Sequence, residues 1–485
     1  MKTYCFCILS LFCLLASAQA PRNFYMRFGG NGYDVGYDVK QTLDNGYIIT
    51  GSTSSFGQGN TDLYLVKLDS MGNRKFERSF GNYNNDIGKS VVQLLDSSYV
   101  AVGYTNSTGL GGYDIFLVKT DKNGNLVWQK TIGGSDWDFA YSLQSTFDGG
   151  FVIAGTTYSF GRGNADGYVV KTDLNGDIEW TKTYGGVHDD EFKSIVQTSD
   201  GGFALTGYTK SYNDVDSGDV WVFKLDVMGD SVWCQFYGGS REDYGNEIIQ
   251  HPSGEYYIVG GTKSYGANLN HASAYAIRLH NNGTFYNDRI DNTSADDQIF
   301  NSIVVSRRSS FYVNTISYFT VTGYEKQIKV LEMDFGLNYT NAAGVGSIVN
   351  DELYKIIATR DKGYACVGYT QGDGAILDDG YFVKFDSLLN YGSFSTVSLK
   401  EEDQVNITLQ VFPNPASREV SVFSDKPLQS KNLKLIDLMG RETDLTGKVI
   451  YVAQNQLKID VQDVAQGVYY LVSGAGKEKL VILRE

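Results

Sequence analysis

Hydrophobic and polar residues alternate along most of the chain in short stretches. Residues 139–146 alternate in this way, and "FVIAGTTYS" (151–159) follows them after the turn sequence "DGG". "GYVVKTD" (167–173) and "IEWTKTYGG" (178–186) complete a group of four stretches separated by glycine, asparagine and aspartate. A period of two residues bounded by such turn residues predicts β-strands joined by hairpins. Helical spacing appears nowhere at convincing length.

The group of four predicted strands recurs along the chain. An aromatic or aliphatic residue before a glycine pair marks each repeat, and an aspartate follows four residues later. These aspartates are spaced by 52, 52, 52, 53, 54 and 54 residues: Asp34, Asp86, Asp138, Asp190, Asp243, Asp297 and Asp351. Radial repetition buries both faces of each small sheet and protects its edges. The spacing therefore predicts an all-β fold, a β-propeller of seven four-stranded blades over residues 21–398.

The segment "NFYMRFGG" (23–30) has the pattern of a fourth strand with its glycine exit, although no repeat precedes it. We expect it to replace the outer strand of the last blade and to pair beside residues 380–386, so that the N-terminal strand closes the ring. Repeats such as "DGYVVKTDLNGDIEWTKTYGG" resemble the bacterial β-propeller repeat family abbreviated SBBP, from residue 28 to about 390. This resemblance implies a fold and an extracytoplasmic setting, but no reaction.

The two ends of the chain indicate export. Residues 1–20 have the pattern of a signal peptide, with Lys2, an apolar run at 4–16 and the small residues "ASA" before the cleavage site. The apolar run is too short to span a bilayer, so we expect no transmembrane segment in the mature chain. Beyond a charged linker at 399–406, alternating strands over residues 407–485 predict a small Ig-like β-sandwich.

The amino-acid sequence of this last segment closely resembles the type A sorting domain of the type IX secretion system of Bacteroidetes. Its landmarks are Pro413–Pro415, Asp437–Arg441, Gly467–Leu471 and Lys477–Glu485. The resemblance implies that residues 407–485 are read by the outer-membrane export machinery, and that the protein is secreted or held at the outer cell surface. An accessory sandwich that binds carbohydrate is the alternative.

Composition excludes some classes of function. The formal charge is −15 and no basic residues cluster, so nucleic-acid binding is not expected. Cys234 and Cys366 fall in separate repeats, which favours two free thiols over one disulfide. The four histidines form no metal-binding pair, and we expect no metal site and no cofactor. We expect a monomer.

Repeated motifs have structural interpretations. The third strands carry Asp-x-aromatic-x-aliphatic-Lys-x-Asp, as in Asp62/Lys67/Asp69, and near-identical copies in most blades favour a scaffold over an active site. Asp-x-Asn-Gly, as at 121–124, is typical of a hairpin turn rather than a calcium loop. Trp128, Trp180 and Trp233 are similar to the tryptophan-docking residues of quinoprotein propellers and are expected to pack between blades.

Two sets of residues could bind a ligand. The seven spaced aspartates could gather a cation or basic ligand near the central channel, or cap sharp turns. The loops that differ between repeats carry aromatic and charged residues suited to sugar or peptide recognition, with packing within the loops as the alternative: Trp137, His188, Asp189, Arg241, Arg162, Tyr212 and Tyr265.

The sequence thus favours a secreted propeller that binds a glycan, peptide or protein ligand. A polysaccharide-active hydrolase or lyase on the same loops, and a structural surface protein, remain alternatives.

Overall fold

The computed structural model describes residues 23–387 with gaps at 213–216, 267–268, 292–296, 307–310, 320–324, 346–349 and within 373–376. It also describes Leu389 and, with shorter gaps, residues 409–482. The signal-peptide segment and the linker at 399–406 lie outside the described residues. The chain divides into two compact units, residues 1–397 and 398–485.

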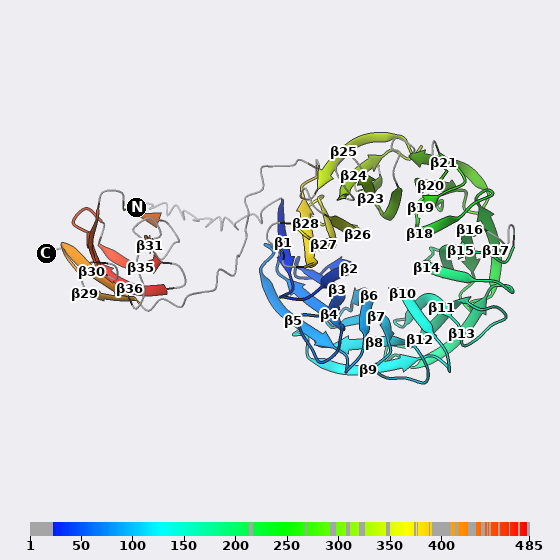
Figure 1. The fold of residues 1–485 in the computed structure, drawn as a ribbon, viewed down its shortest axis with the longest axis horizontal. Coiled ribbons are helices and arrows are strands. Elements are labelled where there is room, and N and C mark those ends of the chain that lie inside the picture. Colours follow the sequence, from blue (N-terminus) through cyan, green and yellow to red (C-terminus); the bar gives the residue numbers. More distant parts are fainter. Residues whose placement is uncertain are drawn as a thin grey trace, which may run out of the picture. The chain divides into compact units, whose positions relative to one another are not determined.

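Six sheets of the first unit each contain four strands that follow one another in the chain, and they form a β-propeller (Figure 1). The first two sheets are β2 (Asp34–Gln41), β3 (Tyr47–Thr53), β4 (Asp62–Leu68), β5 (Arg74–Phe80), and β6 (Asp86–Gln93), β7 (Tyr99–Thr105), β8 (Asp114–Thr120), β9 (Leu126–Ile132). The next two are β10 (Asp138–Ser145), β11 (Phe151–Thr157), β12 (Asp166–Thr172), β13 (Ile178–Tyr184), and β14 (Asp190–Gln197), β15 (Phe203–Thr209), β16 (Asp219–Leu225), β17 (Ser231–Tyr237). The last two are β18 (Asp243–Gln250), β19 (Tyr256–Thr262), β20 (Ser273–Leu279), β21 (Phe285–Asp291), and β22 (Gln298–Val305), β23 (Phe311–Phe319), β24 (Glu325–Met333), β25 (Tyr339–Val345).

A further sheet combines both ends of this unit. Its strand order is β1 (Phe24–Phe28), β28 (Asp379–Phe385), β27 (Tyr364–Thr370) and β26 (Asp351–Ala358). Strand β1 pairs antiparallel with β28, and Phe24 lies opposite Lys384. The predicted pairing of the N-terminal strand beside residues 380–386 is therefore confirmed.

Core residues lie between neighbouring sheets. The second and third strands are buried along their length in most blades, whereas the fourth strand is half exposed. One buried cluster joins Val152 and Val169 of the sheet β10–β13 to Phe192, Phe203 and Trp221 of the sheet β14–β17. Each sheet is therefore stabilised by its neighbours, because burial of apolar surface is the main favourable term in folding.

The innermost strand of each sheet in the first unit contains a β-bulge: β2, β6, β10, β14, β18, β22 and β26. In β2 the register with β3 shifts between Gly36 and Asp38, and in β14 it shifts between Phe192 and Ser194. The bulge leaves one residue, such as Tyr37 or Lys193, outside the regular pairing. These bulged residues line the cavity at the centre of the propeller.

The second unit consists of two four-stranded antiparallel sheets. One contains β29 (Leu409–Phe412), β30 (Glu419–Ser424), β34 (Gln456–Asp460) and β33 (Val449–Ala453); the other contains β32 (Glu442–Thr443), β31 (Leu433–Asp437), β35 (Gly467–Ser473) and β36 (Gly476–Ile482). A single buried cluster draws on both, with Val422 and Leu457 from one sheet and Leu435 and Leu471 from the other. The two sheets therefore share one core.

The part of the chain that the structure describes contains no helix able to cross a membrane.

Candidate functional site

Two sets of loops meet at one end of the propeller. One set runs from a fourth strand to the next first strand, and the other joins the second and third strands of a sheet. Backbone hydrogen bonds connect them: the N–H of Tyr158 donates to the carbonyl of Trp137 (2.7 Å), and the N–H of Lys210 donates to the carbonyl of Asp189 (3.0 Å). We call this end the loop face, and it carries the loop residues that the sequence singled out.

The repeated aspartates lie at the base of the loop face. Asp190 is fully buried and accepts hydrogen bonds from the N–H of Gly186 (2.7 Å) and the hydroxyl of Ser211 (2.6 Å). The same pattern recurs at 2.6–2.9 Å around three further aspartates: Asp138 with Gly134 and Ser159, Asp243 with Gly239 and Ser264, and Asp86 with Asn82 and Ser107. Each carboxylate thus accepts hydrogen bonds from the loop before the first strand and from the loop between the second and third strands, which is the geometry of a turn cap.

Asp297 does not occupy the equivalent position. Strand β22 begins at Gln298, whose side chain is buried where the other first strands bury an aspartate. Asp297 is partly exposed, accepts a hydrogen bond from the N–H of Ala272 (2.5 Å) and lies 3.5 Å from His271 Nδ1. The spacing of the aspartates predicts Asp297 for this position. The sixth repeat instead has Gln298 there, one residue later.

We call the aspartates that begin the first strands the ring aspartates: Asp34, Asp86, Asp138, Asp190, Asp243 and Asp351. A second carboxylate lies beside several of them. A Cβ atom on Gly185 would be 2.2 Å from Asp166 Oδ1 and 2.6 Å from Asp190 Oδ2, so the two side chains of adjacent blades approach across this glycine. Burial raises the pKa of Asp166, and the charge of Asp190 raises it further. The pKa is raised in the same way, by burial and a ring aspartate, at three further third-strand positions: Asp62, Asp114 and Asp379.

No group of three or more histidine, cysteine, aspartate or glutamate side chains among the described residues is arranged to hold a metal ion.

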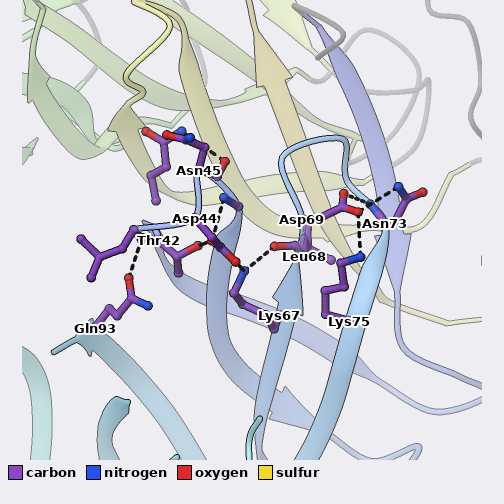
Figure 2. Close-up of polar contacts among 12 residues, drawn as sticks. Thr42, Asp44, Asn45, Lys67, Leu68, Asp69, Asn73, Lys75 and Gln93 are labelled. Atoms are coloured by element: carbon purple, nitrogen blue, oxygen red, sulfur yellow. Dashed lines mark hydrogen bonds and ion pairs between the residues drawn. The ribbon is translucent and has the colours of Figure 1, made fainter. Parts of the chain in front are cut away.

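The repeated lysine of the third strand has a partner that the motif does not contain. Lys67 is buried, and its Nζ donates to Asp44 Oδ2 (2.9 Å) and to the carbonyl of Leu68 (2.8 Å) (Figure 2). Asp69, two residues after the lysine, instead accepts hydrogen bonds from Asn73 in its own turn and lies 3.2 Å from Lys75. Equivalent ion pairs of 2.8–3.0 Å join Lys171 to Asp148, Lys224 to Asp200 and Lys384 to Asp361.

The glycine turns and tryptophans join neighbouring blades. In the turn at 121–125, Gly124 has a φ of +80° and its N–H donates to the carbonyl of Asp121 (3.1 Å). Three tryptophans pack against the turn glycine of the next blade, with a hypothetical Cβ 2.7–2.8 Å away: Trp128 on Gly176, Trp180 on Gly229 and Trp233 on Gly283. The tryptophans thus pack between blades, as the sequence predicts.

Four of the predicted ligand-binding residues contact neighbouring loops and strands of the propeller. The ring centroid of Tyr212 lies 5.0 Å from that of Phe236, and the hydroxyl of Tyr265 donates to the carbonyl of Gly238 (2.5 Å). The guanidinium of Arg241 donates to the carbonyl of Leu269, and the backbone N–H of Arg162 donates to Asp166 Oδ2 (2.8 Å). These contacts favour packing within the loops as the main role of the Tyr212, Tyr265 and Arg241 side chains, whereas the contact of Arg162 is made by its backbone.

The other three predicted residues border the third and fourth blades. The indole of Trp137 is 49% exposed and lies 5.9 Å from the ring of Tyr158. Asp189 Oδ2 lies 3.7 Å from Lys210 Nζ. His188 contributes its backbone N–H, which donates to Ser211 Oγ (3.2 Å). Trp137 and Asp189 therefore contact different neighbours, and Arg241 and Tyr265 lie at a separate blade.

The bulged residues of the first strands line a central cavity of about 190 Å³, and the sequence did not single them out. They are Tyr37, Lys89, Tyr141, Lys193, Asn246, Asn301 and Tyr354. Each is the third residue after the start of its first strand, so a column of tyrosine, lysine and asparagine at this position was the available signal.

A larger pocket of about 500 Å³ adjoins the central cavity. We call it the mouth pocket, and it is lined by Lys193, Tyr208, Glu242, Tyr244, Asn246, Lys263, Ile299 and Asn301. Lys263 Nζ lies 2.6 Å from Glu242 Oε2, and Lys193 Nζ lies 5.5 Å from the centroid of the Tyr244 ring. The mouth pocket thus combines aromatic rings, charges of both signs and amide groups.

Comparison with known proteins identifies the C-terminal unit. Residues 410–482 match the family described as the secretion system C-terminal sorting domain. The regulatory protein FlaEY of Caulobacter vibrioides is 27% identical over 204 residues, which is 36% of this chain and 21% of that protein. The match thus spans about a fifth of that relative's length.

Similar solved structures include the WD40 domain of Pan2 from Neurospora crassa, at 10% identity, with 75% of this chain and 96% of that chain covered and a TM-score of 0.45. A protein of unknown function from Dyadobacter fermentans has 10% identity, covers 76% of this chain and 99% of its own, and has a TM-score of 0.41. This chain's own sheet topology makes the first unit a β-propeller, and the family match makes residues 410–482 a type IX secretion sorting domain, which implies export to the cell surface or the medium.

Proposed function

We propose that the protein is an extracellular binding module that holds a ligand in the mouth pocket. The observation that carries this proposal is the composition of the pocket, where the rings of Tyr208 and Tyr244 lie among Lys193, Glu242 and Lys263. Aromatic rings offer flat apolar area, and a few polar groups around them orient a ligand. Among glycan, peptide and protein ligands, the two lining amides and the rings favour a glycan.

The rival function, polysaccharide hydrolysis or lysis, would be favoured by two carboxyl groups placed around one scissile bond. Among the described residues that line the mouth pocket, Glu242 is the single carboxylate, and it is paired with Lys263. Binding without turnover is therefore the better proposal. A purely structural surface protein would leave the mouth pocket without a ligand.

A glycan and peptide array with the purified protein tests this function, followed by product analysis on every hit. We expect Tyr244→Ala to abolish binding of the hit, because the ring forms one wall of the pocket. Tyr83→Ala is the control, since Tyr83 is 80% exposed and does not line the pocket. A ligand that binds equally to both variants would place the site elsewhere, and turnover that depends on Glu242 would favour the enzyme.

We also propose a finer architecture and maturation. The composite sheet β26–β28 with β1 acts as the seventh blade, and the second unit is an Ig-like sandwich that occupies residues 407–485. The signal peptide at 1–20 is removed, and the mature protein works as a monomer whose repeats resemble the SBBP family. Mass spectrometry of the exported protein tests the first cleavage, which we expect to leave an N-terminus near Gln19 or Pro21.

A further inference from the structure

The lining of the central cavity is positively charged in a chain with a formal charge of −15. Four lysines and two carboxylates line it: Lys40, Lys89, Lys193 and Lys355, with Asp38 and Glu247. The excess of positive charge is concentrated inside the ring.

The two carboxylates of the cavity are already occupied. Asp38 accepts hydrogen bonds from Lys40 Nζ (2.8 Å), Ser90 Oγ (2.8 Å) and the N–H of Val91 (3.0 Å). Glu247 forms an ion pair with Lys355, and it accepts hydrogen bonds from Ser302 Oγ (2.5 Å) and the N–H of Ile303 (2.9 Å). Both carboxylates join adjacent blades and balance Lys40 and Lys355, which leaves two lysines.

Lys89 carries the remaining charge, because Lys193 has a carboxylate partner in Glu191. Lys89 forms no ion pair with any described residue; its Nζ lies 3.4 Å from the centroid of the Tyr37 ring and 5.9 Å from that of Tyr104. Lys193 Nζ lies 3.8 Å from Glu191 Oε1. A half-buried ammonium whose described neighbours are aromatic faces lacks the counter-charge that buried ions normally have.

The electrostatic state of Lys89 agrees with this geometry. Burial, followed by the charge of Lys193, lowers the pKa of Lys89 to about 8. The two ammonium groups thus repel each other across the cavity. An anion between them would remove this repulsion and complete the coordination of both.

We propose that the cavity binds an oxyanion, a carboxylate or sulfate group, between Lys89 and Lys193, and that this group belongs to an acidic oligosaccharide. This inference rests on the proposed glycan-binding function and specifies its ligand. Lys193, Asn246 and Asn301 line both the central cavity and the mouth pocket, so one ligand can reach both. The cavity volume of about 190 Å³ equals roughly six water molecules, which is room for an anionic group and its remaining water.

Isothermal titration of the full chain tests the proposal with sulfate, trigalacturonate and its neutral counterpart galactotriose. We expect sulfate and trigalacturonate to bind, with trigalacturonate at least tenfold tighter than galactotriose. Lys89→Met should lose at least tenfold in affinity for both anions and keep its affinity for galactotriose. Lys89→Arg should retain anion binding, and Lys182→Met, on the outer strand β13, is the control.

The outcomes separate the two proposals. Equal anion affinity of Lys89→Met and the parent chain would overturn the oxyanion site. Sulfate binding without trigalacturonate binding would overturn the saccharide source, as would tight binding of an oligoglutamate peptide instead. Tyr244→Ala changes the mouth pocket and leaves Lys89 in place, so we expect it to keep its affinity for sulfate and to lose galactotriose. Retained galactotriose affinity in this variant would overturn the mouth pocket and leave the oxyanion site standing.

Discussion

The indole of Trp180 lies against Gly229 of the next blade, where a Cβ atom would be 2.8 Å from the ring. The backbone of Gly229 has a φ of +78°, which L-residues rarely adopt. This glycine is thus required both for its backbone conformation and for the close approach of the tryptophan. The two requirements can be separated, because Gly201 has a φ of +85° and no atom within 4 Å of its hypothetical Cβ.

We expect Gly229→Ala to destabilise the propeller more than Gly201→Ala. Both substitutions strain the backbone by about 1 kcal/mol, and only the first also displaces the indole, at a further cost of about 1–3 kcal/mol. Equilibrium unfolding in urea measures the difference. Equal losses in the two variants would show that the tryptophan does not depend on the glycine.

Phe24 makes the N-terminal strand part of the ring. Its ring occupies the space over Gly72 of the first blade. The ring centroid lies 5.7 Å from that of Phe382 in β28, the strand with which β1 pairs. Removal of this buried ring by Phe24→Ala should cost about 3–5 kcal/mol, and deletion of residues 23–28 should lower Tm further. Leu95→Ala is the control, since Leu95 is 96% exposed. An unchanged Tm after the deletion would contradict ring closure by β1.

Asp166→Asn tests the carboxylate pairs between blades. Asparagine keeps an oxygen that can accept from the N–H groups of Arg162 and Gly163 and removes the repulsion with Asp190. The pKa of Asp166 is raised by folding, so the folded protein binds more protons and loses stability as pH rises through the raised pKa. We therefore expect Asp166→Asn to gain stability over the parent chain between about pH 4 and neutral pH.

Unfolding experiments at pH 4 and pH 7 check this expectation. Asp177→Asn, at an exposed position on the same hairpin, is the matched control. If the difference in stability between Asp166→Asn and the parent is the same at both pH values, folding does not raise the pKa of Asp166.

Asp44 and Asp148 occupy equivalent turns, and each forms an ion pair with a buried third-strand lysine, but the two lysines differ in their other ion pairs among the described residues. Lys171 forms a second ion pair, with Glu179 (2.8 Å). Buried Lys67 forms its ion pair with Asp44 (2.9 Å) (Figure 2). Asp44→Ala should therefore cost about 2 kcal/mol or more, and Asp148→Ala about half as much. Chemical denaturation of both variants measures the contrast, and a larger loss for Asp148→Ala would contradict it.

Lys89→Met should stabilise the protein in the absence of a ligand. The folded pKa of Lys89 is about 8, below the unfolded value of about 10.4, so the parent chain carries the full penalty below pH 8. The penalty disappears as pH rises from about 8 to about 10.4. The stability difference between Lys89→Met and the parent should be about 1 kcal/mol or more at pH 7 and small at pH 10.5. Lys182→Met should show no such trend.

The sequence predicts the fold because four strands and their turns repeat with little change. It also predicts the place of β1, since residues 23–28 repeat the pattern of a fourth strand. Pairing across strands is harder to predict: Lys67 contacts Asp44, which lies in a different hairpin from the motif residue Asp69. The sixth repeat shows the limit of spacing, because Gln298 rather than Asp297 begins β22.

The central residues escaped prediction for a different reason. A β-bulge adds one residue to the first strand and shifts the alternation of buried and exposed positions, as between Gly36 and Asp38. Simple alternation therefore does not assign Tyr37 or Lys89 to the cavity. The loop residues, by contrast, differ between repeats, and the structure uses several of them for packing.

The bulges also separate two demands on the same strand. On either side of Lys193, Phe192 pairs with Gly207 and Ser194 pairs with Thr206, so the register of β14 and β15 continues without it. A substitution at Lys193 changes the cavity and leaves this pairing in place. Because every first strand has such a residue, the chemistry of the cavity can diverge blade by blade, during evolution or in design, on a constant hydrogen-bonded frame.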